Sequence, residues 1–185
     1  MQTTKTTKYF GNVELNNCYA FSPIFNGQKI RIGISWWSSG NKEAEDILPL
    51  FWETIDKYAE INEIAKKAII DYYDFPLDAL DEDNDEHWVG LPDKIWSIQY
   101  FFETLFGYMP ENELIEVFET KNLQELDIKK VVEKMFYPDL TIYLQSGIQI
   151  GLSYGFSLLN NWHEKSLNVY LDKDLNLTGF LGLLD

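Results

Sequence analysis

The sequence is poor in cysteine and in long apolar runs. Cys18 is its single cysteine, so the chain cannot form an internal disulfide. The amino-terminal residues lack the apolar core of a signal peptide, and no apolar run reaches the roughly 18 residues that a membrane-spanning helix requires. We therefore expect a soluble, cytoplasmic protein in a reducing compartment, without membrane contact.

Positive charge, and arginine above all, is also scarce. Arg31 is the single arginine among 15 basic residues, which face 30 acidic residues and leave a formal net charge of −15. A surface of this sign repels phosphate backbones and anionic lipids, which argues against nucleic acids and membranes as partners. It favours a basic protein partner. A genome rich in A and T would also account for the shortage of arginine.

The sequence also has few histidines and no recognisable catalytic motif. His87 and His163 are the two histidines, and each stands beside a tryptophan. Adjacent residues of an extended segment point in opposite directions, so Glu164 is badly placed to assist His163, which we interpret as a turn residue. No nucleophile elbow, Walker loop, dinucleotide fingerprint or HExxH helix occurs. Without a basic neighbour, Cys18 is predicted to be a small core residue rather than a nucleophile. We therefore assign no catalytic residues and no cofactor.

The clearest pattern that is present occupies the last third of the chain. Residues 148–157 alternate strictly, with apolar side chains at the even positions from 148 to 156. Together with the runs 139–145, 165–172 and 175–184 and their short turns, they predict a four-stranded antiparallel meander. The other face of the second strand carries small residues, which allow close approach of a helix of this chain or of a partner's backbone: Gly151, Ser153, Gly155 and Ser157.

A second pattern lies near the amino terminus. Asn26-Gly27 separates two apolar runs, and this pair is preferred in two-residue type I′ hairpin turns because both positions need positive φ. A turn there predicts these cross-strand pairs: Phe25–Gln28, Pro23–Ile30, Phe21–Ile32 and Tyr19–Ile34. Because Pro23 cannot donate a hydrogen bond, its strand should be an edge strand or irregular. We expect a short strand over 9–15 before this hairpin and a frayed polar tail over 1–7.

Between the two strand regions the apolar spacing is helical. It predicts a long helix, or a pair broken near 60–62, that begins near 46–48 with Pro49 in its first turn. Further helices are predicted over 92–107, 111–118 and 123–136. The whole pattern predicts one α+β domain, residues 1–185, in which an N-terminal β-hairpin with a preceding strand and the C-terminal meander flank central helices. We expect these helices to pack on one face of the sheet.

Acidic residues are concentrated in the segment 74–86, which holds seven acids and no base. Asp81, Asp83 and Asp85 have the alternate spacing that opens an EF-type calcium loop, but the sixth and twelfth positions lack the required glycine and bidentate acid. We therefore predict no metal site and interpret the segment as a solvated loop whose three aspartates contact a basic partner. A metal-dependent hydrolase that uses these acids with His87 is the alternative hypothesis.

Trp36 and Trp37 are the remaining candidates for a partner-binding site. Neighbouring residues of a strand point to opposite faces, so at most one of the two rings can join the sheet core with Ile32 and Ile34. The other ring is either covered by a helix or a loop, or exposed to a partner. A structural homodimer that pairs through this tryptophan or through a sheet edge is a further alternative.

Three short motifs resemble an uncharacterised group of small bacterial α+β proteins, known as domains of unknown function: YFGNVEL at 9–15, FNGQKI at 25–30 and SLNVYLD at 166–172. Members of similar groups are often accessory or immunity-type proteins that bind and neutralise a partner, and the resemblance implies no catalytic residues. Residues 1–40 carry four bases and one acid, a net charge of +3, so residues 41–185 carry −18. Our leading hypothesis is a non-enzymatic, immunity-like binding protein whose acidic surface meets a basic protein.

Overall fold

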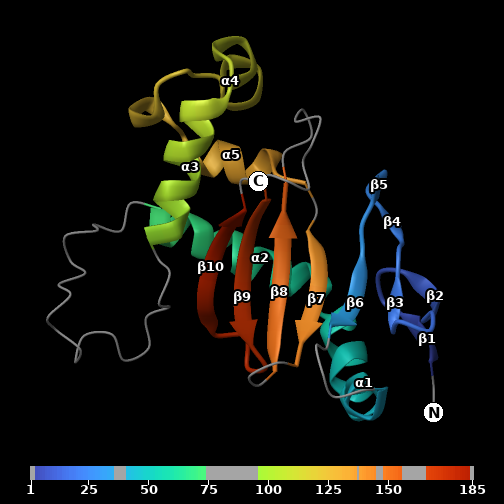
Figure 1. The fold of residues 1–185 in the computed structure, drawn as a ribbon. Coiled ribbons are helices and arrows are strands. Elements are labelled where there is room, and N and C mark those ends of the chain that lie inside the picture. Colours follow the sequence, from blue (N-terminus) through green and yellow to red (C-terminus); the bar gives the residue numbers. More distant parts are fainter. Residues whose placement is uncertain are drawn as a thin grey trace, which may run out of the picture.

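A computed structural model describes residues 3–35, 41–73, 96–136, 138–144, 148–155 and 166–183 (Figure 1). The fold is α+β, with strands at both ends of the chain and helices between them. The amino-terminal strands are β1 (Thr4–Thr7), β2 (Gly11–Glu14), β3 (Ala20–Phe21), β4 (Ile24–Phe25), β5 (Gln28–Lys29) and β6 (Ile32–Ser35). The helices are α1 (Asn41–Asp56), α2 (Tyr58–Tyr73), α3 (Trp96–Tyr108), α4 (Glu111–Phe118), the short 3-10 helix η3 (Leu123–Glu125) and α5 (Ile128–Lys134). The carboxyl-terminal strands are β7 (Asp139–Tyr143), β8 (Gln149–Tyr154), β9 (Ser166–Asp172) and β10 (Leu177–Leu183).

The main sheet has six strands in the order β10-β9-β8-β7-β6-β3. Strands β7 to β10 form the predicted antiparallel meander. Strand β6 pairs with β7 in parallel, with Ile32 opposite Leu140, so strands from the two ends of the chain share one sheet. Strands β1 and β2, and strands β4 and β5, form two further antiparallel pairs outside it.

The hairpin predicted at Asn26-Gly27 is confirmed together with its register. Asn26 and Gly27 have φ values of 48° and 82°, as a type I′ turn requires. The predicted pairs are present as strand partners or as backbone hydrogen bonds: Phe25 with Gln28, Phe21 with Ile32, Ile30 N to Pro23 O at 3.0 Å, and Ile34 N to Tyr19 O at 3.2 Å. The outer strand is interrupted at Pro23 and β3 is the edge of the main sheet, as expected for a residue without an N–H.

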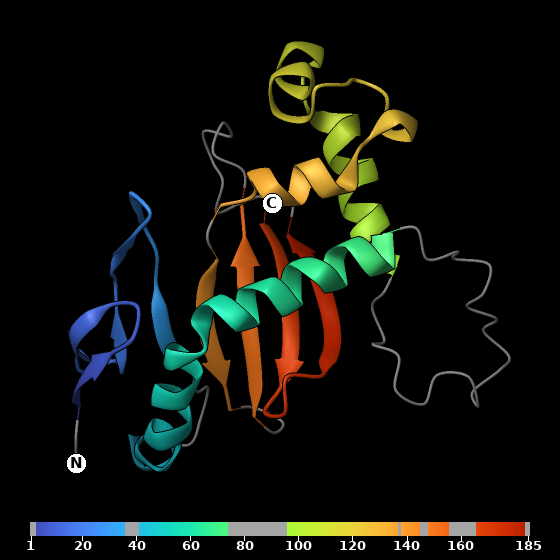
Figure 2. The same ribbon diagram turned by 180° about the vertical axis from the view of Figure 1, so that it is seen from behind.

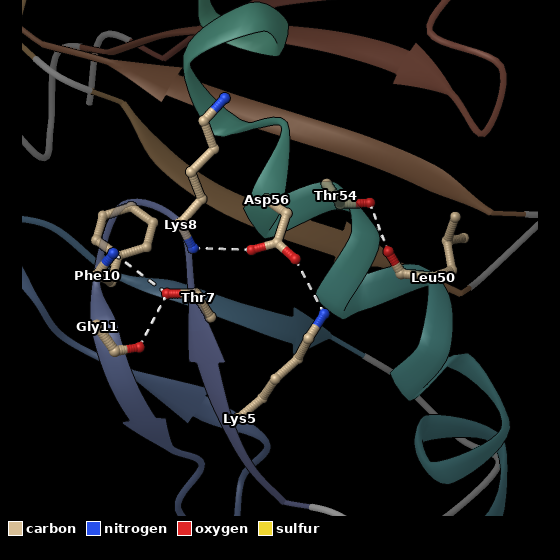
Figure 3. Close-up of polar contacts among 8 residues, drawn as sticks. All are labelled: Lys5, Thr7, Lys8, Phe10, Gly11, Leu50, Thr54 and Asp56. Carbon is tan, nitrogen blue, oxygen red and sulfur yellow. Dashed lines mark hydrogen bonds and ion pairs between the residues drawn. The ribbon is translucent and has the colours of Figure 1, made fainter.

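The polar tail predicted at the amino terminus is instead strand β1, which pairs with β2 from Thr4–Glu14 to Thr7–Gly11. The prediction was wrong because it relied on polarity, whereas β-branched threonine favours an extended backbone. Asp56, at the end of α1, holds this hairpin in place (Figure 3). Its carboxylate accepts hydrogen bonds from the Lys8 backbone N–H at 3.0 Å and from the Lys5 ammonium at 3.0 Å.

The predicted helix pair exists, but its bounds differ. Helix α1 begins at Asn41, so Pro49 lies inside the helix rather than in its first turn. Pro49 is exposed, and a carbonyl that loses its partner on the solvent side of a helix remains open to water. The break between the helices falls at Lys57, whose N–H bonds to the Thr54 carbonyl, rather than at 60–62.

The core lies between the sheet and helix α2, which crosses one face of the sheet (Figure 2). The sheet residues that point to this face are completely buried: Leu140, Ile142, Ile150, Leu152, Tyr154, Leu167, Val169, Leu171 and Phe180. Two tyrosine hydroxyls inside the core donate hydrogen bonds, Tyr154 to Asn62 Oδ1 at 2.8 Å and Tyr58 to the Pro138 carbonyl at 2.7 Å. Each therefore ties helix α2 to the carboxyl-terminal third of the chain.

Candidate functional site on the open sheet face

The opposite face of the sheet is the candidate site. Figure 1 looks onto this face, and none of the labelled helices crosses in front of β7, β8 and β9. Because side chains alternate along a strand, the strand register places these residues there: Asp139, Thr141 and Tyr143 of β7, Gln149, Gly151 and Ser153 of β8, and Asn168, Tyr170 and Asp172 of β9. We call these nine residues the open sheet face. They are polar, small or aromatic, in contrast to the aliphatic face beneath. Gly151 and Asn168 are buried, and the other seven are partly exposed.

A row of mostly small residues crosses the whole sheet on this side. The register aligns, from β3 to β10, Ala20, Gly33, Thr141, Gly151, Tyr170 and Gly179. Tyr170 is the one large side chain in the row, and its partners on both neighbouring strands are glycines. The ring therefore has no side chain beside it along the row.

The two tyrosines of the open sheet face leave no room for a side chain at position 151, which is a glycine. A Cβ atom at this position would lie 2.6 Å from Tyr143 Cε2 and 3.2 Å from Tyr170 Cε1. The rings of Tyr143 and Tyr170 lean over the glycine from β7 and β9, with centroids 5.9 Å apart and planes inclined at 64°. Gly151 on β8 thus accommodates two aromatic rings of this chain, where the sequence led us to consider a helix of this chain or a partner's backbone.

Both tyrosines are partly exposed. Burial, and next the neighbouring Tyr143 hydroxyl, raise the pKa of Tyr170 to about 12. The Tyr170 hydroxyl therefore stays protonated at neutral pH and cannot act as a base. What the pair offers to a ligand is the face of an uncharged ring and a hydroxyl group.

The charged groups of the open sheet face are both acidic. Burial opposes ionisation of Asp172, but hydrogen bonds from Asn176 and Asp174 outweigh it and leave the pKa of Asp172 below its usual value. The carboxylate of Asp139 accepts the backbone N–H of Arg31 at 2.6 Å. The six strands, as the structure describes them, contain these two acids and no lysine or arginine. The nine residues therefore carry negative charge only, and the base Arg31 adjoins them where its N–H bonds to Asp139.

The site residues predicted from the sequence are not among these nine. Trp36, Trp37, Asp81, Asp83 and Asp85 fall outside the described residues, as do His87 and His163, and their roles stay predictions. Cys18 is a correction: it is exposed rather than part of the core. It lies in the turn between β2 and β3, where its N–H bonds to Asn16 Oδ1 at 2.9 Å, because the chain reverses before the sheet begins.

Sequence reasoning missed Tyr143 and Tyr170. Tyr170 carried a signal, since it alternates with the apolar residues of 166–172 and must face away from the core. Tyr143 depended on the register of the first meander turn. A two-residue turn at 146–147 would set Tyr143 opposite Ile150, whereas it pairs with Gln149. A difference of one residue moves a side chain to the other face of the sheet.

Within the described part of the chain, no group of three or more His, Cys, Asp or Glu side chains could hold a metal ion. None of the helices within the described ranges is long and apolar enough to cross a membrane. Comparisons with models of known protein families, with curated proteins and with solved structures find no match to this chain. The functional proposal therefore depends on charge and on the geometry of the open sheet face.

Proposed function

We propose that this chain is a non-enzymatic binding protein whose acidic surface recognises a basic protein partner. The observation that carries the proposal is the open sheet face, on which two carboxylates and two tyrosines lie on a sheet whose described strands hold no base. Tyrosine is enriched where protein partners bind, and complementary charge speeds encounter and disfavours wrong partners. The net charge of −15, with −18 on residues 41–185, adds to this negative field.

The acidic segment 74–86 and the tryptophans Trp36 and Trp37 belong to the same proposal as further partner contacts. Seven acids in the segment add to the field that a cationic partner meets. The resemblance to immunity-type proteins favours one form of this proposal, in which the partner is a toxin and binding neutralises the toxin. Co-expression would then restore the growth of cells that make the toxin.

The experiment is affinity capture with the tagged protein from the cells that make it, at about 0.05 M and about 0.5 M salt. We expect a basic protein to be captured at low salt and released at high salt, and its affinity to be measured next by titration with the purified partner. A variant with Asp81, Asp83 and Asp85 changed to asparagine should bind more weakly. If no basic protein is captured at low salt, the proposal is wrong.

One observation favours a second candidate, a structural homodimer. Strand β10 is an edge of the six-stranded sheet, and its seven residues, LTGFLGL, include no charge and no proline that would discourage pairing with another strand. Two copies that pair along β10 would form one continuous sheet. Sedimentation velocity at micromolar concentration decides this: a dimer supports the candidate, and a monomer excludes it.

A further inference from the structure

We infer that Tyr143 and Tyr170, leaning over Gly151, form a seat for an arginine side chain of the partner. This inference rests on the proposed function and adds to it the chemical group that the open sheet face takes. It follows from the shape of the aromatic pair, from the charge around it and from the chemistry of guanidinium.

The shape suits a flat group. Tyr170 stands between Gly151 and Gly179 in its row. The Tyr143 ring lies over Gly151, so the side of the Tyr170 ring toward Gly179 is the one that no row partner's side chain fills. The Tyr143 ring is inclined to it at 64°, so the pair presents aromatic surface in two directions. Gly151 makes room for both rings, because a Cβ there would collide with them, so the seat is the outer surface of the pair and not a gap between the rings.

The charge suits a cation. Asp172 and Asp139 lie on the same face as the two rings. The six described strands hold no lysine or arginine, and Arg31, one residue before β6, is the base that adjoins Asp139. Hydrogen bonds within the chain already engage both carboxylates, Asp139 with Arg31 N–H and Asp172 with Asn176 N–H at 2.9 Å. They therefore act through their field, while the rings provide the contact. The negative face of an uncharged tyrosine ring attracts a cation in the same direction.

Among cationic side chains, arginine fits best. Its guanidinium is planar, stacks on aromatic faces and is more weakly hydrated than the lysine ammonium, so it loses less hydration when it leaves water. Cation–π contacts in proteins accordingly involve arginine more often than lysine. A phosphate or carboxylate ligand would be repelled by the two aspartates.

The test uses two fluorescent peptides, one of alternating arginine and glycine and one with lysine in place of arginine, titrated at about 0.15 M salt. We expect tighter binding of the arginine peptide, and a Kd about two- to five-fold higher for Tyr143→Leu and for Tyr170→Leu. Tyr170→Phe keeps the ring and should bind like the wild type. Tyr108→Leu is the matched control, because Tyr108 is 77% exposed at the end of α3.

A second readout needs no variant. In NMR spectra of the wild-type protein with the arginine peptide bound, the arginine side-chain protons should shift upfield because of the ring currents of the two tyrosines. Equal affinities for all variants, or unshifted arginine protons, would overturn the seat. The proposed function would then still stand if the captured basic partner binds both Tyr→Leu variants in a salt-dependent manner. If the partner itself is not captured, the proposed function fails on its own test. Equal binding of the lysine peptide would also exclude the stacked arginine.

Discussion

The buried hydrogen bond between Tyr154 and Asn62 allows the sharpest prediction of stability. Tyr154 is completely buried on β8, and Asn62, on α2, is 4% exposed. The Tyr154 hydroxyl donates to Asn62 Oδ1 at 2.8 Å, across the interface between helix and sheet. Desolvation, and next the nearby Tyr58, raise the pKa of Tyr154 well above its usual value, so the hydroxyl remains a donor throughout the accessible pH range.

The perturbation is Tyr154→Phe, which removes the donor and keeps the ring. Asn62 Oδ1 then loses this donor in a site from which water is excluded, and a buried acceptor without a partner costs about 1–3 kcal/mol. For a chain of this size, each kcal/mol lowers Tm by about 2–4 °C. We therefore expect a clearly reduced free energy of unfolding without a change in fold.

Urea denaturation followed by circular dichroism measures this difference, with Tyr108→Phe as the exposed control. The double variant Tyr154→Phe/Asn62→Leu should recover part of the loss, because the acceptor is then absent as well. A free energy of unfolding for Tyr154→Phe within about 0.5 kcal/mol of the wild type would contradict the reasoning, since changes of that size are typical of surface positions.

Three further predictions concern single residues. Gly33→Ala places a Cβ 2.8 Å from Ala20 Cβ, so the strand backbone must move, and we expect a loss of about 1–3 kcal/mol in urea denaturation. An unchanged denaturation midpoint would show that β3 can move aside without cost. Gly107→Ala, inside helix α3 with open space around it, should stabilise by up to about 1 kcal/mol, measured as a higher Tm. The Lys8 N–H, and next Lys5, lower the pKa of Asp56. The ionised Asp56 carboxylate therefore stabilises the folded protein above about pH 4, and this stabilisation is lost as the pH falls through the pKa of Asp56 in the folded state. Asp56→Asn should be less stable by under about 1 kcal/mol at pH 7 and equal to wild type in strong acid.

Local signals explain what the sequence predicted correctly. Asn26-Gly27 fixes a turn geometry, and the register then follows by counting outward from it. Helix α4 has the predicted bounds, Glu111–Phe118, because Pro110 precedes it and its apolar residues recur at helical spacing. In each case the cause and the structure lie within a few residues of each other.

Long-range pairing explains what could not be predicted. Nothing near Ile32 indicates that it will lie beside Leu140, because parallel neighbours share no turn. The candidate site depends on the same kind of information. Tyr143 and Tyr170 come from strands on either side of β8, and only the register of both meander pairs brings their rings together over Gly151. The anionic character, by contrast, was visible from composition alone.

The parallel pairing of β6 with β7 also governs when the sheet can be completed. During synthesis β6 leaves the ribosome early, and its partner follows only after more than a hundred further residues have been added. Until then Ile32 and Ile34, which are buried in the finished sheet, have no β7 to shield them. A chain truncated before β7 would keep that unpaired edge, and such edges promote aggregation. The nascent amino-terminal strands thus depend on the last third of the protein for protection.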